Sequence, residues 1–396
     1  MNPGEVFLDE ARQFYAGFRK SYNNALYHSQ QQQQAIDLRY HHQDHQMIAT
    51  TMDPNLWSHL PDDLLDRILA WLPIDAFFRL ATLCRRWSRL ATSKSFHDLC
   101  ATVPSTAILF VKIIACDCQQ LLTTFSPAAS RWYKLPLAFL PPNAGLPVAT
   151  ARGLLCFTNH FQGYNNDEYT ALFVCNPLTK AWRELPPMLF HHRPTLVTMV
   201  ADAATKSYKL VVAGRWTTEV YSSATNSWKR SACLPRGEEI SRNVALCNGV
   251  LYCLTPRWYN CSLLAFSLQH ETWIKIKTGR LPGYCQFRNL VECSGQVAIV
   301  GKCVRHQVFT ICVWFLDQRS LKWREVGRMP KVMAEHFLVM PSESFYCSGI
   351  RNLVFLTRDN SHDGVLFDIS TKSWRWVPDC PNLEGMAFEP RLDAVP

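Results

Sequence analysis

The sequence has no uninterrupted apolar run of the roughly 20 residues that a membrane-spanning helix needs. It also lacks a strong excess of either charge, because 41 basic and 32 acidic side chains leave a formal net charge of +9 over 396 residues. So mild an excess does not by itself predict a nucleic-acid partner. The first residues, MNPGEVFLDEARQ, lack the basic start and apolar stretch of a secretory signal. We therefore expect the protein in the cytoplasm, the nucleus or both, with no membrane partner.

Cysteines at metal-binding spacing are also missing. The 16 cysteines include no CxxC pair, and Cys116 and Cys118 form a CxC with no second ligand pair nearby. In a reducing compartment we expect these thiols to stay reduced and mostly to pack as small apolar side chains. The chain also lacks P-loop, GxGxxG, HExxH and GxSxG motifs. These absences predict no metal, no cofactor and no catalytic residue.

Residues 1–55 form a polar, irregular head that we expect to be largely disordered. Apolar residues recur at helical spacing within residues 8–28. This short segment either forms an amphipathic helix for a partner or packs on the protein's own domain, and the pattern does not decide between the two. The glutamine run at 30–34 and the histidines after it are more typical of a solvated linker than of a metal site.

Residues 56–100 are dense in leucine and spaced for helices, as LWSHLPDDLLDRILAWLPIDAFFRLATLCRRWSRLATSKSF shows. Pro61 suits a first helical position, and the two aspartates after it suit the positive end of a helix dipole. Two apolar stripes follow, one from Leu64 to Leu72 and one from Leu80 to Leu90. A helical unit this short cannot bury so many apolar side chains, so some of them should face a partner.

This segment resembles an F-box. The resemblance rests on the Leu60-Pro61 opening, the LLDRIL stretch, the Leu72-Pro73 pair and the LCRRWSRL ending. In that family the box docks onto a Skp-type adaptor, which joins it to the cullin and RING subunits of a ubiquitin ligase. The alternative is that these residues only pack a helical bundle inside a larger domain. The resemblance implies that the docking or box-core residues are Leu60, Pro61, Leu64, Ile68, Leu72, Pro73, Leu80, Cys84 and Trp87.

From residue 101 onward strand-like runs replace helical patterns, and one pattern returns six times. NPLTKAWRELPP is one copy, with a turn, then a Trp, then a Pro. A period near 50 residues with several short strands per unit is typical of kelch-type propeller blades. We therefore predict that residues 101–396 form a mainly β fold, a six-bladed kelch-like β-propeller. The repeated tryptophans are Trp132, Trp182, Trp228, Trp273, Trp323 and Trp374.

Each repeated Trp follows a hairpin turn and should begin the last strand of its blade. A large aromatic side chain in that place can fill the space between adjacent sheets, so we predict a structural role for all six. The Pro that follows, Pro186 in the quoted copy, suits the end of an edge strand because it cannot donate to a ladder. The alternative is that these tryptophans stack on a ligand.

The kelch pattern is incomplete, because the Gly-Gly pair usual after the second strand of such blades is absent and single glycines stand in its place. The F-box followed by degenerate blades resembles plant F-box/kelch-repeat proteins. The ending SWRWVPDCPNLEGMAFEPRLDAVP is also similar to the tail of that group. We expect residues 385–392 to return to blade 1 and close the ring.

Basic and aromatic residues recur in one set of loops, 13 to 18 residues before the Trp of blades 3 to 6. Loops at equivalent places in successive blades emerge on one face, and Arg and aromatic side chains dominate binding hot spots. We expect this face to hold a target protein with an acidic or phosphorylated element. The alternative is that these are ordinary solvated loop charges. The candidate residues are Arg215, Trp216, Arg257, Trp258, Tyr259, Arg305, His306 and Arg358.

The sequence therefore predicts a non-catalytic substrate receptor of a Skp-cullin-F-box ubiquitin ligase. Two other classes stay open. The propeller could serve as a transcriptional or scaffold adaptor without degradation of its target. It could also be an oxidoreductase whose metal is held by Tyr, His and Cys, because 13 Tyr and 16 Cys allow such a set to form on folding.

Overall fold

The computed structural model describes residues 60–103, 108–113, 121–159, 171–189, 194–214, 217–255, 261–278, 281–282, 288–305, 308–338, 344–358, 363–377, 380 and 385–396. The head, with its predicted helix at 8–28, lies outside these residues. The chain divides into two units, Met1–Pro61 and Asp62–Pro396, and every helix and strand named below belongs to the second. No helix among the described residues is long and apolar enough to cross a membrane.

Four short helices begin this unit: α3 (Asp62–Ala70), α4 (Ile74–Ala81), α5 (Arg85–Leu90) and α6 (Lys94–Thr102). Their starts follow from the sequence. The Ser93 hydroxyl accepts a hydrogen bond from the Phe96 N–H at 3.4 Å, and Cys84 Sγ accepts one from the Trp87 N–H at 3.5 Å. Such bonds satisfy N–H groups that a first helical turn leaves unpaired.

The helices enclose a small core of their own. Leu69, Phe77, Leu90 and Phe96 are buried in it, and the Phe77 and Phe96 rings stack with centroids 5.2 Å apart. Leu392, from the C-terminal tail, is part of the same cluster. A residue almost 300 positions away therefore helps to bury a helical unit that is too small to complete its own core.

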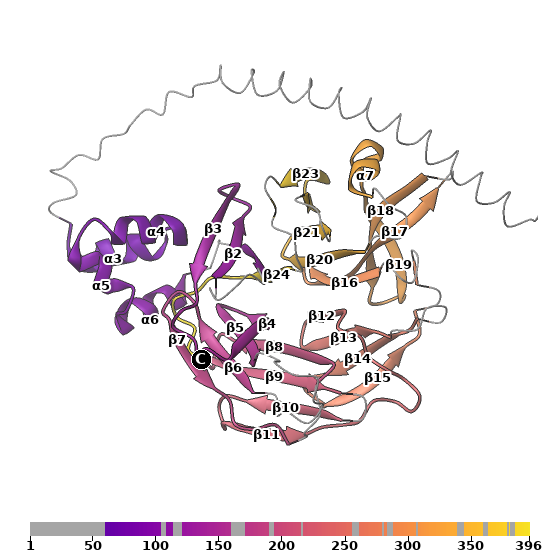
Figure 1. Cartoon of the computed structure of the whole chain (residues 1–396), viewed down its shortest axis with the longest axis horizontal. Coiled ribbons are helices and arrows are strands. Elements are labelled where there is room, and N and C mark those ends of the chain that lie inside the picture. The colour runs from indigo at the N-terminus through magenta and orange to yellow at the C-terminus, as the bar shows by residue number, and fades with distance from the viewer. Residues whose placement is uncertain are drawn as a thin grey trace, which may run out of the picture. The chain divides into compact units, whose positions relative to one another are not determined.

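The strands form six four-stranded antiparallel sheets, which confirms the predicted propeller (Figure 1). In each blade the strands below run from the innermost to the outermost. Blade 1 contains β24 (Gly385–Phe388), β1 (Leu109–Ile113), β2 (Leu121–Ser126) and β3 (Arg131–Pro136). Blade 2 contains β4 (Ala144–Ala151), β5 (Leu154–Asn159), β6 (Leu172–Asn176) and β7 (Ala181–Glu184). Blade 3 contains β8 (Leu196–Asp202), β9 (Ser207–Ala213), β10 (Thr218–Ser222) and β11 (Ser227–Arg230).

The remaining blades repeat this order. Blade 4 contains β12 (Val244–Cys247), β13 (Val250–Leu254), β14 (Leu263–Ser267) and β15 (Thr272–Ile276). Blade 5 contains β16 (Arg288–Cys293), β17 (Gln296–Arg305), β18 (Val308–Asp317) and β19 (Lys322–Arg328), and α7 (Lys331–Phe337) follows it. Blade 6 contains β20 (Phe345–Ile350), β21 (Leu353–Arg358), β22 (Gly364–Asp368) and β23 (Ser373–Val377).

One turn joins the third and fourth strands of every blade. The third strand ends in Ser, Asn or Asp, and in blades 1, 2, 4, 5 and 6 the side chain of that residue accepts from an N–H of the turn, as when Asn176 Oδ1 accepts from Leu178 at 3.0 Å. Four residues after this Ser, Asn or Asp, the backbone takes a left-handed conformation, and two residues later comes the repeated Trp. This local geometry explains the repeated pattern. The left-handed residues are Ser130, Lys180, Asn226, Glu271, Leu321 and Lys372.

Five of the six repeated tryptophans pack against a neighbouring blade, all from the outermost strand. Trp228 Nε1 donates to the Pro186 carbonyl of blade 2 at 2.7 Å, and Trp273 Nε1 donates to the Thr218 hydroxyl of blade 3 at 2.9 Å. The Trp132 ring lies 6.5 Å from that of Phe355 in blade 6. Trp323 and Trp374 pack on the clusters that join blades 4 and 5 and blades 5 and 6.

Trp182 differs from the other five, because it does not fill the space between adjacent blades as predicted. Its side chain is 42% exposed and meets only the edge of Phe173, in its own blade, among the ring contacts of the described residues. Leu137 and Leu140 are buried in the cluster that joins blades 1 and 2. The chain leaving β3 therefore fills the space that a Trp fills between other blades.

The C-terminal tail closes the ring, as the sequence predicts. β24 pairs antiparallel with β1 in the register Leu109↔Phe388 to Lys112↔Gly385. As the innermost strand of blade 1, β24 also contacts β4 of blade 2 and β20 of blade 6. The first and last strands of the propeller are thus hydrogen-bonded partners, and blade 1 is incomplete without residues from the far end of the chain.

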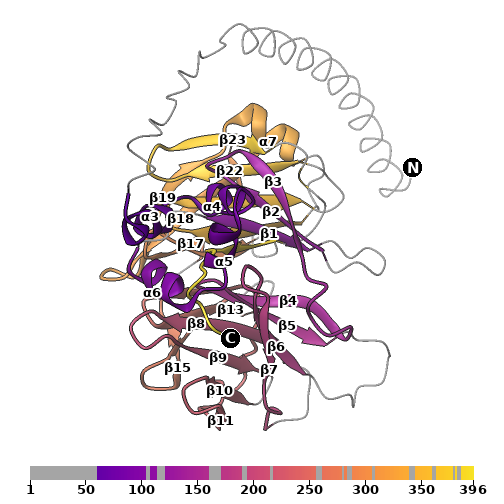
Figure 2. The same cartoon turned by 90° about the vertical axis from the view of Figure 1, so that its left-hand side faces the viewer.

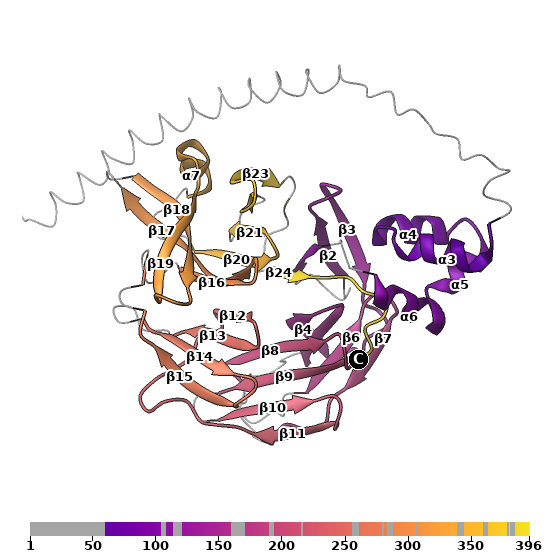
Figure 3. The same ribbon diagram turned by 180° about the vertical axis from the view of Figure 1, so that it is seen from behind.

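Beyond β24 the tail runs past α6 toward β7, as Figures 1 and 3 both show. The buried Arg391 guanidinium donates to Asp393 at 2.6 Å and to the Cys100 carbonyl of α6 at 3.0 Å. In blade 2, Asn176 Nδ2 donates to the Arg391 carbonyl at 2.9 Å. Gly153, at φ +85°, leaves room for this passage, because a Cβ there would lie 2.8 Å from the Arg391 Cβ. The tail therefore joins blade 1, blade 2 and the helices.

We predict that Arg391→Met lowers the free energy of unfolding by about 3 kcal/mol, because Asp393 keeps a buried charge with only the longer Arg152 contact left at 3.5 Å. Urea denaturation would measure the loss. The matched control is Lys229→Met, which breaks the exposed 2.8 Å pair with Glu271. We expect that change to cost less than about 1 kcal/mol. Equal losses in the two variants would contradict the role given to Arg391.

Candidate adaptor-docking and target-binding surfaces

Helix α3 exposes an apolar stripe. Leu64, Ile68 and Trp71 are 41%, 39% and 64% exposed. They follow one another at i, i+4 and i+7, which places them along one side of the chain as it runs through α3 and the turn after it. Leu69, on the opposite side, is 4% exposed and belongs to the helical core. The helix is therefore apolar on both sides, and only one side has a partner within the described residues.

The connection from α4 to α5 adds to this apolar surface. Leu83 is 69% exposed there, and Cys84 beside it is also exposed. Arg86 holds the start of α5 against α3, because its guanidinium lies 2.7 Å from the Asp66 carboxylate and 3.3 Å from that of Asp62. We call Leu64, Ile68, Trp71, Leu83 and Cys84 the exposed F-box surface.

The nine residues named from the F-box resemblance divide into two groups. Leu72, Leu80 and Trp87 are half-buried and pack on the helical core. Leu60 is half-buried too, whereas the other five are exposed: Pro61, Leu64, Ile68, Pro73 and Cys84. Sequence reasoning missed Trp71 and Leu83, although Trp71 continues the Leu64–Ile68 spacing and could have been found from it.

Among the described residues, three polar contacts join the helices to the propeller, and Figure 2 shows these helices in front of the blades. The Tyr133 hydroxyl in β3 donates to Asp75 of α4 at 3.2 Å. Lys206, in the β8–β9 turn, lies 2.6 Å from Asp98 of α6. The third is the Arg391 bond to Cys100 described above. Burial, followed by the charge and hydrogen bond of Asp75, raises the pKa of Tyr133, so the phenol stays protonated as the donor.

Most of the predicted target-binding residues lie outside the described part of the chain. These are Arg215, Trp216, Arg257, Trp258, Tyr259 and His306, and for Arg305 only the backbone, at the end of β17, is described. Arg358 requires a correction, because its side chain is only 9% exposed, 3.4 Å from Asp363 and 6.0 Å above the Phe337 ring. It ends β21 as a packed residue and is not the exposed loop cation that the sequence predicted.

A pair of thiols lies in β17 and β18, near the connection between these two strands. Cys303 in β17 and Cys312 in β18 have their Sγ atoms 2.7 Å apart, and Arg328 Nη1 lies 3.6 Å from Cys303 Sγ. The hydrogen bond from the Cys312 thiol and the charge of Arg328 lower the pKa of Cys303 to about 7, although burial opposes them. The same neighbour and burial raise the pKa of Cys312. The pair therefore places the thiolate on Cys303.

Across the described residues, no three His, Cys, Asp or Glu side chains gather in a way that could hold a metal ion. The cysteines there are free, and burial raises the pKa of several of them, including Cys156, Cys175 and Cys293. These thiols pack as apolar side chains in the blade cores.

Family comparisons agree with both parts of this architecture. The F-box domain model matches residues 57–99, the segment that carries the exposed apolar stripe. A model described as KIB1-4 beta-propeller matches residues 124–373, well over half of the chain. The chain belongs to the KIB1-4 beta-propeller family. Its members' propeller is here preceded by an F-box, and the expected combination of F-box and propeller is confirmed.

The similar proteins are plant F-box proteins. The chain is 28% identical to an F-box/kelch-repeat protein of Arabidopsis thaliana, over 86% of this chain and 90% of that protein. It is 27% identical to Protein UNUSUAL FLORAL ORGANS of the same plant, over 86% of each. SKP1-interacting partner 15, also from Arabidopsis thaliana, is 25% identical over 85% of this chain and 98% of its own length. The predicted resemblance to plant F-box/kelch-repeat proteins is confirmed.

We predict that the exposed F-box surface contributes little to folding. The double variant Trp71→Ser/Leu83→Ser should change the free energy of unfolding by less than about 0.5 kcal/mol, because both side chains already face water. Leu69→Ala should cost about 2–5 kcal/mol, because it leaves a cavity in the core. Urea denaturation of the three proteins tests this. A loss in the double variant as large as that in Leu69→Ala would show that these residues are structural.

We also predict that iodoacetamide alkylates Cys303 at pH 7, because its lowered pKa leaves much of the thiol ionised there. Arg328→Gln should slow that reaction, since removing the positive charge raises the pKa of Cys303 and shrinks the thiolate fraction. Peptide mass spectrometry would follow the rate between pH 6 and pH 9. Arg319→Gln, which removes a charge elsewhere in blade 5, serves as the control. Equal slowing in both variants would contradict a local effect of Arg328.

Proposed function

We propose that this protein is the substrate receptor of a Skp-cullin-F-box ubiquitin ligase. One observation carries the proposal, the exposed F-box surface on a helical unit that matches the F-box family. Four large apolar side chains that face water on so small a unit are typical of a protein-binding site. The name of SKP1-interacting partner 15 describes an interaction of that relative with a Skp-type protein, and we extend it to this chain.

The adaptor would then link the F-box to the cullin and RING subunits, while the propeller captures a target protein. The chain supplies binding energy and geometry and no catalytic group. Its contribution to ubiquitin transfer is proximity, because a target held near the reactive thioester meets it at high effective concentration. We propose that the complex works in the cytoplasm, the nucleus or both.

The contacts between the helices and the propeller support such a role. Tyr133, Lys206 and Arg391 belong to three separate places along the propeller chain, and each binds a different residue of the helices. A propeller joined at several points cannot swing freely about a linker, so a bound target keeps a defined place relative to the adaptor. The residues at 215–216, 257–259 and 305–306 are our sequence-based candidates for target contact.

The proposal predicts that Trp71→Ser/Leu83→Ser weakens binding of a plant Skp-type adaptor. Loss of apolar hot-spot contacts should cost at least about 2 kcal/mol, or roughly thirtyfold in Kd. Isothermal titration calorimetry with purified adaptor gives the value. The matched control is Ile274→Ser/Val332→Ser, which removes two apolar side chains that are 55% and 78% exposed on the propeller.

The control variant should bind the adaptor as the wild-type protein does. If the wild-type protein does not bind the adaptor, or if both double variants bind equally well, the receptor function is wrong. Because the double variant at the F-box is expected to keep its stability, a loss of binding cannot be mistaken for unfolding.

A further inference from the structure

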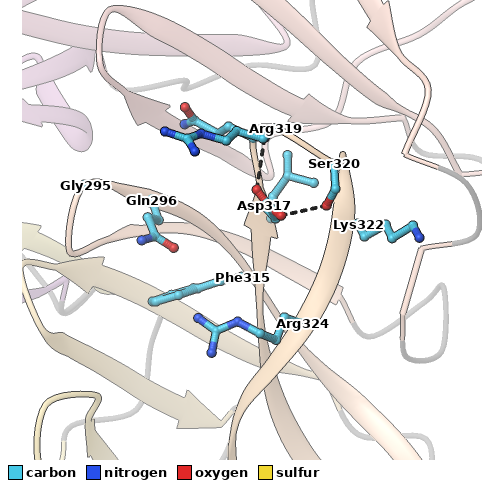
Figure 4. Close-up of a pocket in the computed structure, with 10 residues that line it drawn as sticks. Gly295, Gln296, Phe315, Asp317, Arg319, Ser320, Lys322 and Arg324 are labelled. Atoms are coloured by element: carbon cyan, nitrogen blue, oxygen red, sulfur yellow. Dashed lines mark hydrogen bonds between the residues drawn. The ribbon is translucent and has the colours of Figure 1, made fainter.

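Blade 5 carries a surface hollow of about 620 Å³ that the proposed function leaves unused (Figure 4). Its volume lies within the range of roughly 300–1,000 Å³ that is usual for ligand sites. The hollow lies between the β16–β17 turn and the β18–β19 hairpin. Its lining residues are Gly295, Gln296, Phe315, Leu316, Asp317, Gln318, Arg319, Ser320, Lys322 and Arg324.

Three cations line the hollow, Arg319 on the turn and Lys322 and Arg324 on β19. All three are exposed, and none makes an ion pair or a side-chain hydrogen bond with a residue that the structure describes. Asp317 is the sole acid in the lining, so the formal charge is three minus one, or +2.

The Asp317 carboxylate is already engaged by its own turn. Its Oδ1 accepts from the Arg319 N–H at 3.0 Å, and its Oδ2 accepts from the Ser320 hydroxyl at 2.7 Å, as the dashed lines in Figure 4 show. These hydrogen bonds lower the pKa of Asp317, the Ser320 bond most. The carboxylate therefore holds the turn in shape and lies among the cations without pairing with any of them.

The alternation of β19 explains why two of the cations lie outside the core of the blade. Trp323 turns inward to the cluster that joins blades 4 and 5, so Lys322 and Arg324 on either side of it point outward. In Figure 4 the Phe315 ring lies between Gln296 and the Arg324 guanidinium. The packing of Trp323 thus keeps both charges out of the core, and in Figure 4 Arg324 extends toward Phe315 whereas Lys322 extends away from it.

Arg324 occupies a position that other blades use for cross-linking. This position is the one directly after the repeated Trp, and every blade has it. In four other blades this side chain binds a neighbouring blade or helix, whereas Arg324 has no such partner among the described residues. The four contacts are Tyr133 to Asp75 at 3.2 Å, Arg183 to Asn226 at 2.9 Å, Lys229 to Glu271 at 2.8 Å and Arg375 to the Pro127 carbonyl at 2.8 Å.

The topology places the hollow on the F-box side of the ring. In an antiparallel blade the turns that join strands one and two and strands three and four leave at one end, and the remaining connection leaves at the other. The hollow is lined by the first two kinds of turn. Leu178 and Lys206, which contact the helices, lie in the same two kinds of turn in blades 2 and 3.

We propose that this hollow binds an acidic peptide segment of the target protein, an inference that rests on the proposed receptor function. Carboxylates of the segment pair with Arg319, Lys322 and Arg324, and the Gln296 amide offers a neutral donor beside them. The site lies at the opposite end of the blades from the connections between strands two and three. This segment of the target would then be held on the same side of the propeller as the adaptor.

The lining favours a peptide over a nucleic acid. Single-stranded nucleic acids bind to basic grooves that carry exposed aromatic rings on which bases stack. The one aromatic residue of this lining, Phe315, is 6% exposed and is part of the core between blades 5 and 6. Three cations over one short strand and its turn fit a few carboxylates better than a continuous phosphate backbone.

The test uses the full chain, purified both alone and after coexpression with a Skp-type adaptor. Fluorescence anisotropy measures its binding to a short fluorescein-labelled oligoglutamate peptide. We expect binding that weakens as NaCl rises and that falls at least about tenfold in Arg319→Glu/Lys322→Glu/Arg324→Glu. The milder Arg319→Gln/Lys322→Gln/Arg324→Gln should lie between this variant and the wild type. A control with the same charge change at three exposed positions outside the hollow, Arg236→Glu/Arg242→Glu/Lys277→Glu, should bind as the wild type does.

Three outcomes would overturn the inference. Equal losses in the hollow variants and in the control would show a general effect of net charge. Tighter, hollow-dependent binding of a labelled single-stranded oligonucleotide than of the peptide would assign the site to nucleic acid. Adaptor copurification is scored on the same samples. Intact adaptor binding with no peptide binding refutes the hollow and leaves the receptor function standing, and the reverse result refutes the receptor function alone.

Discussion

The pairing of β24 with β1 is the constraint on which the rest of the structure depends. A propeller ring needs its last blade to meet its first, and this chain meets the need by sending its final strand back into blade 1. The residues after that strand then cross blade 2 and reach the helices, with Arg391 and Leu392 at the crossing. One short segment therefore both closes the ring and supplies one of the contacts that attach the helices, beside those of Tyr133 and Lys206.

The blade register could be predicted from sequence because it depends on the local geometry of one turn. Ser, Asn or Asp at the end of the third strand, a left-handed residue four positions later and a Trp two positions after that recur in all six blades. Neighbouring backbone atoms decide each of these choices. The exposure of Trp182 could not be predicted in this way, because Leu137 and Leu140 fill its space from another part of the fold. Tertiary packing decided that position.

In the F-box too, the local pattern could be predicted from the sequence, whereas the tertiary packing could not. Helical spacing predicts which residues share a face, but it does not say which face is covered. Leu72 and Leu80 pack on the helical core, whereas Leu64 and Ile68 remain exposed with Trp71. Arg358 is the opposite case, since a basic residue beside a predicted loop proved to be a packed strand end. Charge in a sequence indicates exposure only where no acid or ring lies within reach, and that requires the fold.

Comparison of equivalent positions in the six blades shows which of them makes no structural contact. The residue after each repeated Trp projects toward the neighbouring element, and four blades use it to bind that neighbour. Ile274, in blade 4, is apolar and 55% exposed, and Arg324 is charged and unpaired within the described part of the chain. Blade 5 keeps its packing through Trp323 and its turn through Asp317. The packing of blade 5 therefore does not require its exposed cations. A charged residue that makes no structural contact at a repeated position can change the binding partner of a propeller without changing its fold.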